Sequence, residues 1–193
     1  MTGVLNTRIA FNLGTRASFR VLILASVFGA LCSFFVLDVS AQSSEQQIKA
    51  AFLYHFCSYV QWPNISTVNG TATIVIGIAG SRRSLGYFER TLAGVHKNRF
   101  NLIVRPVAPS DNLESINILY VTNDSGFFLK DFQKLTAKSP ILTVTEEATI
   151  PDGSMINFVL REDKVRFEAS NSRATAASLK LSSQLLAIAV QVH

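Results

Sequence analysis

The middle of the chain carries four short apolar runs rich in β-branched residues, at 71–80, 99–108, 116–123 and 140–146. SRRSLGYFERTLAGV follows the first run and DSGFFLKDFQKLTAK follows the third, and both place apolar residues at helical spacing. Apolar strands that alternate with helices through short connections are typical of a parallel sheet buried on both faces. We therefore predict a layered α/β domain with right-handed crossovers.

The last third of the chain breaks this alternation. Residues 153–170, GSMINFVLREDKVRFEAS, predict an antiparallel hairpin that turns at REDK. In its second arm Arg166 and Glu168 alternate with apolar residues, so we expect both on a solvent-facing side. The fold class predicted is a largely parallel sheet of about six strands with a C-terminal antiparallel hairpin and helices on both faces.

Helix-start signals mark both ends of this domain. Ser43 or Ser44, followed three residues later by glutamine, predicts the start of a first helix that ends near Gln61, before a proline. Asn171 or Ser172 can cap a final helix that runs almost to the C-terminus.

Residues 1–41 resemble an export signal, because three arginines precede an apolar run from Val21 to Leu37 and VSA offers small residues for cleavage. Cleavage after Ala41 would leave a single domain, 42–193; an uncleaved anchor is the alternative. Removing three of 18 basic residues and one of 13 acidic residues leaves 15 and 12, a net charge of +3. The basic residues are scattered, so we expect no nucleic-acid partner.

His55 and Cys57 are the first candidates for chemistry. Residues two apart on a helix point about 200° away from one another, so these two cannot act as a local pair. Cys57 becomes the only cysteine once Cys32 leaves with the signal, which excludes an intramolecular disulfide. We expect Cys57 to be packed and His55 to lie on or beside the buried stripe, with a crosslink between protomers or a Cys57-dependent enzyme as alternatives.

A small-ligand site is a second possibility, at the carboxyl ends of the predicted parallel strands. A strand that runs into a helix N-terminus can hold an anion with its free N–H groups. The candidate residues at these ends are Ser81, Arg82, Asn123, Ser125 and Thr145. The chain contains no G-x-G-x-x-G, GK[ST], G-x-S-x-G or H-E-x-x-H, so we predict no catalytic residue, metal site or cofactor.

Four segments together resemble one family. They are IKAAFLYHFCSYVQWP, INILYVTN, ILTVTEEATIPDGSMINFVL and VRFEASNSRATAASLKLSSQLLAIA. In this order, across about 45–190, they are similar to the YfiR/HmsC-like family of bacterial periplasmic regulators. The resemblance implies a dimeric, non-enzymatic α/β protein that represses an inner-membrane diguanylate cyclase by binding its periplasmic region, which lowers cyclic-di-GMP and biofilm formation. It also implies an OmpA-like lipoprotein that can sequester the repressor.

Eight positions of this sequence carry the family signature. The residues are Trp62, Pro63, Met155, Asn157, Phe158, Arg166, Phe167 and Glu168. We expect Asn157 to satisfy backbone groups near the hairpin and Phe158 and Phe167 to pack. Arg166 and Glu168 share one face of the hairpin arm, where they can form an exposed ion pair with each other or contact a partner. Two departures from relatives are the single cysteine and the turn GSRRS, so neither redox bridging nor a ligand preference of that turn transfers.

Overall fold

The computed structural model describes residues 37–63, 65, 67–68, 70–93, 100–125 and 139–193. Residues Ser43–His193 form one compact unit. The predicted helix at 124–138 lies almost wholly outside the described residues.

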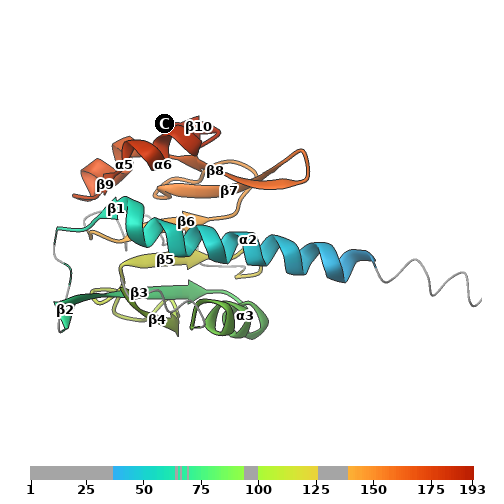
Figure 1. Cartoon of the computed structure of the whole chain (residues 1–193), viewed down its shortest axis with the longest axis horizontal. Helices are drawn as coiled ribbons and strands as arrows, with labels where there is room; N and C mark the ends of the chain where they lie inside the picture. The colour runs from blue at the N-terminus through green and yellow to red at the C-terminus, as the bar shows by residue number, and fades with distance from the viewer. Residues whose placement is uncertain (1–36, 64, 66, 69, 94–99, 126–138) are drawn as a thin grey trace, which may run out of the picture. The chain divides into compact units, whose positions relative to one another are not determined.

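One mixed sheet forms the centre of the unit (Figure 1). Its main strands are β3 (Thr71–Ala79), β4 (Phe100–Pro106), β5 (Ile118–Val121), β6 (Leu142–Thr145), β7 (Ile156–Arg161) and β8 (Lys164–Ala169). β4, β3, β5, β6 and β7 lie side by side and are parallel, whereas β7 and β8 form an antiparallel hairpin. The predicted fold class is therefore confirmed. Pro106 ends β4, which pairs only with β3 among the strands described.

Short strands extend this sheet and form a second one. β2 (Thr67–Val68) pairs with the start of β3, and β10 (Gln191–Val192) runs parallel to the end of β8. β1 (Val60–Gln61) and β9 (Lys180–Leu181) form a separate two-stranded sheet. The helices among the described residues are α2 (Leu37–Tyr59), α3 (Arg82–Ala93), α5 (Asn171–Ala176) and α6 (Ser183–Ile188).

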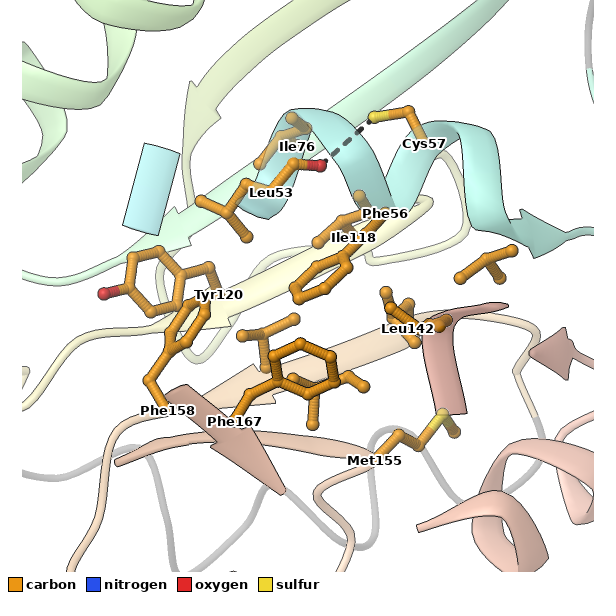
Figure 2. Packing of buried hydrophobic residues seen from close by; sticks show 14 of the residues in the cluster. Leu53, Phe56, Cys57, Ile76, Ile118, Tyr120, Leu142, Met155, Phe158 and Phe167 are labelled. Atoms are coloured by element: carbon orange, nitrogen blue, oxygen red, sulfur yellow. Dashed lines mark hydrogen bonds between the residues drawn. The ribbon is translucent and has the colours of Figure 1, made fainter. Parts of the chain in front are cut away.

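The main core lies where α2 packs on the sheet. Leu53, Phe56 and Cys57 point from α2 toward the strands, and Figure 2 shows them above Tyr120 and Phe167. The Phe56 and Phe167 rings meet edge to face, 5.5 Å between centroids. Each fully buried side chain of this size stabilises the fold by about 1.5–3 kcal/mol, so α2 is fixed to the sheet by its aromatic face.

Two helix predictions are wrong in part. α2 begins at Leu37, before the expected capping box, and ends at Tyr59 because Val60 and Gln61 pair with β9. The final helix does not run continuously. It is α5, a break, β9 and then α6, whose N-cap is Ser182. Ser178 adopts a left-handed φ of 61°, which interrupts the helix, and the pairing of Leu181 with Val60 stabilises the interruption.

Candidate functional site

The N-terminus of α3, where an anion was expected, already holds a carboxylate of the chain itself. The Asp124 carboxylate accepts hydrogen bonds from the Ser81 N–H at 3.2 Å and the Ser84 hydroxyl at 2.9 Å, and also one from Thr122. Burial would raise the pKa of Asp124, but these hydrogen bonds outweigh it and lower the pKa to about 2. Ser81 caps the helix, because its Oγ accepts the Ser84 N–H.

The remaining ligand candidates are not brought together at one place. The Thr145 side chain is fully buried, and its hydroxyl is bonded to Ser154 at 2.9 Å and to Asn157 at 2.8 Å. Arg82 is exposed, and the Ser125 backbone N–H closes a turn onto Thr122. Of the five candidates, only Asn123 lines the cleft described next.

An open cleft of about 300 Å³ lies between the middle turns of α2, the segments after β5 and β6, and the β7–β8 hairpin. Its residues are Glu45, Lys49, Asn123, Glu146, Glu147, Ala148, Phe158, Val159, Leu160, Arg161 and Val165. The residues from α2 and from the segment after β6 are mostly charged, whereas the hairpin supplies most of the apolar side chains. The cleft can therefore hold a group that carries both charge and apolar surface.

A buried ionic network forms the polar wall of this cleft. Lys49 Nζ contacts Glu45 Oε1 at 2.5 Å and also binds Glu146, whose other oxygen accepts the Asn123 N–H at 2.7 Å. Burial alone would lower the pKa of Lys49, but Glu146 and Glu45 outweigh it and raise the pKa. Lys49 is thus held as a cation between two carboxylates.

The Tyr120 hydroxyl lies buried near this network. Figure 2 shows it directed away from the centre of the core. Burial raises the pKa of Tyr120, and the negative charge of Glu146 raises it further. Tyr120 therefore stays a neutral phenol.

Asn157 fixes the backbone of the segment that follows β6. Its side-chain amide donates to the Glu147 carbonyl at 3.0 Å, and its Oδ1 accepts the Glu147 N–H at 2.9 Å. Asn157 is fully buried, so this clamp is rigid. The prediction that Asn157 satisfies backbone groups near the hairpin is confirmed.

The predicted partner-contact residues differ in exposure. Arg166 is exposed, but Glu168 is only 6% exposed, so the expectation that both face solvent is wrong for Glu168. The reason is β10, which pairs with β8 at this position and covers it. Glu168 contacts Arg161 at 3.5 Å and His193 at 4.0 Å rather than Arg166.

His55 and Cys57 lie on different sides of α2. Cys57 is buried and donates to the Leu53 carbonyl at 3.4 Å, and burial raises its pKa to about 12, which makes it a poor nucleophile. His55 is exposed between Tyr54 and Tyr59, so its expected place on or beside the buried stripe is wrong. Phe158 and Phe167 are buried as expected.

Sequence reasoning missed Lys49 and Glu147 as site residues. Lys49 was visible as a lone charge on the apolar side of the first helix, four residues after Glu45, a spacing that favours ion pairs. Glu147 belongs to the charged pair Glu146–Glu147, a pattern typical of a solvated turn, and nothing in the sequence shows its clamp to Asn157. Within the described ranges, no group of three or more His, Cys, Asp or Glu residues is arranged to hold a metal ion.

A family model described as YfiR/HmsC-like matches residues 46–190. No curated protein matches the chain. Among the helices the structure describes, none is both long enough and apolar enough to cross a membrane.

Proposed function

Since the chain belongs to the YfiR/HmsC-like family, we propose that it is an exported periplasmic regulator that binds and represses an inner-membrane diguanylate cyclase. In this proposal residues 1–41 are a signal peptide and 42–193 are the working domain. Repression lowers cyclic-di-GMP and biofilm formation, an OmpA-like lipoprotein relieves it, and the protein acts as a homodimer.

The observation that carries the proposal is the extent of the family match. It covers 46–190, almost the whole compact unit, so the resemblance concerns the entire fold and not a single motif. The chemistry of the described residues agrees with a binding role: the one described cysteine is buried and protonated, and the strongest polar clusters hold the fold together.

The test is binding to the periplasmic region of a membrane diguanylate cyclase encoded near this gene. Purified 42–193 is immobilised and the cyclase fragment is passed over it, with an unrelated periplasmic fragment as the control. The proposal predicts saturable binding of the cyclase fragment alone. It fails if no such fragment binds and deletion of the gene leaves cellular cyclic-di-GMP unchanged.

Small-ligand binding is a second candidate, favoured by the cleft of about 300 Å³ that Asn123 helps to line. That volume lies at the lower end of small-molecule sites. A thermal-shift screen of nucleotides, amino acids and sugars tests it. Stabilisation that Asn123→Ala removes supports this candidate, and a screen without any stabilising compound contradicts it.

A further inference from the structure

The cleft carries a negative charge that its own surroundings do not neutralise. Its two cations are already engaged, because Lys49 lies between Glu45 and Glu146, and Arg161 pairs with Glu168. The Glu147 carboxylate, by contrast, makes no hydrogen bond or ion pair with any residue the structure describes. A positively charged group entering the cleft would find this carboxylate available.

Glu147 is also held in place, unlike the carboxylate of an ordinary surface turn. Both of its backbone polar groups are bound by the fully buried side chain of Asn157, at 2.9 and 3.0 Å. A carboxylate on a fixed backbone loses less conformational entropy on binding than one on a loose loop. The hydrogen bonds from Asn157 therefore reduce the conformational entropy that Glu147 loses when it binds a partner.

The hairpin places an exposed apolar side chain at the opposite rim. Leu160 is 56% exposed and pairs with the buried Val165 across the hairpin. The turn is closed by Glu162 and Asp163, whose φ values of 50° and 56° lie in the left-handed region that residues with side chains adopt at a cost. This two-residue turn fixes the register and so the position of Leu160.

We infer that this cleft is the docking site for the partner protein, and that its occupant is a Lys or Arg side chain carried beside an apolar residue of the partner. Glu147 receives the cation, and Leu160 with the hairpin wall receives the apolar neighbour. Charge complementarity selects this occupant, because the free group in the cleft is a carboxylate. The inference rests on the proposed function, whose cyclase fragment supplies the partner.

The experiment measures the dissociation constant of the cyclase periplasmic fragment by isothermal titration with 42–193 and five variants, of which Glu147→Gln serves the salt test. Glu147→Lys tests the charge and Glu114→Lys is its control, since Glu114 is an exposed glutamate that lies away from the cleft, on the β4–β5 connection. Leu160→Ser tests the apolar rim, and Ile103→Ser, 44% exposed on β4, is its control. Thermal denaturation of each variant shows whether it is folded.

We expect Glu147→Lys to weaken binding at least about tenfold and Leu160→Ser about fivefold, with both controls within about twofold of wild type. Added salt should weaken wild type more than Glu147→Gln. The inference is overturned if wild type binds the fragment and folded Glu147→Lys binds equally well. Failure of wild type itself to bind removes the partner on which the inference rests and counts against the proposed function, so the two failures are distinguishable.

Discussion

Replacing Lys49 with methionine should strongly destabilise the fold. The Lys49 and Glu146 side chains are only 9% and 8% exposed, and the substitution leaves the Glu146 carboxylate without its cation, although it still accepts the Asn123 N–H. Breaking a buried ion pair by removing one member costs about 3–5 kcal/mol. Since the cleft gives water some access to Glu146, we expect the lower end, about 3 kcal/mol.

Urea denaturation of 42–193 measures this loss directly, and thermal melting should show a fall of roughly 6–12 °C for a domain of this size. The second substitution Glu146→Gln removes the stranded charge and keeps an acceptor for Asn123, so Lys49→Met/Glu146→Gln should recover most of the loss. Lys180→Met is the control, because Lys180 is exposed. A Lys49→Met loss below about 1 kcal/mol, or no recovery in the double variant, would mean that the Lys49–Glu146 ion pair does not stabilise the fold as described.

Three further predictions concern single side chains. Because Cys57 is buried with its pKa raised to about 12, native protein should not react with Ellman's reagent at pH 8 whereas urea-unfolded protein should; rapid native labelling would contradict its burial. The pKa of Asp124 is lowered to about 2 in the folded protein, so the stability that its carboxylate contributes is present above the unfolded pKa near 4 and is lost as the pH falls from 4 toward 2. Asp124→Asn should remove this part of the loss of stability in acid. If the variant and wild type lose stability with the same pH dependence, the role of Asp124 is contradicted. Asn157→Ala strands the Glu147 N–H and carbonyl, so unfolding in urea should show a loss of about 2–3 kcal/mol, with exposed Asn101→Ala as the control; equal stability of the two would contradict the clamp.

The strands could be predicted because their patterns are local. Runs such as 71–80 are long, apolar and β-branched, and no competing helical period fits them. The prediction of one continuous C-terminal helix was wrong because the interruption of that helix does not depend on a local pattern. Its apolar residues do recur at helical spacing, but the left-handed Ser178 and the pairing of Leu181 with Val60, 121 residues earlier in the chain, depend on tertiary contacts.

At the candidate site, too, local features could be predicted from the sequence, whereas features that depend on tertiary contacts could not. The helix start at Ser81 was predicted, yet the group that binds there is Asp124, 43 residues away, which no local pattern reveals. Glu168 follows the alternation of its strand correctly, but its burial depends on β10 at the far end of the chain. Asn157 could be assigned a structural role from the family signature, whereas its effect on Glu147 required the fold.

The level of cyclic-di-GMP in cells shows whether this protein represses a cyclase. It is measured in a strain lacking this gene, in the same strain carrying the gene, and in a double deletion that also lacks the neighbouring cyclase. If the protein represses that cyclase, cyclic-di-GMP rises in the single deletion, returns to the starting level with the gene restored, and does not rise in the double deletion. An unchanged level in the single deletion, or an equal rise without the cyclase, would contradict this repression.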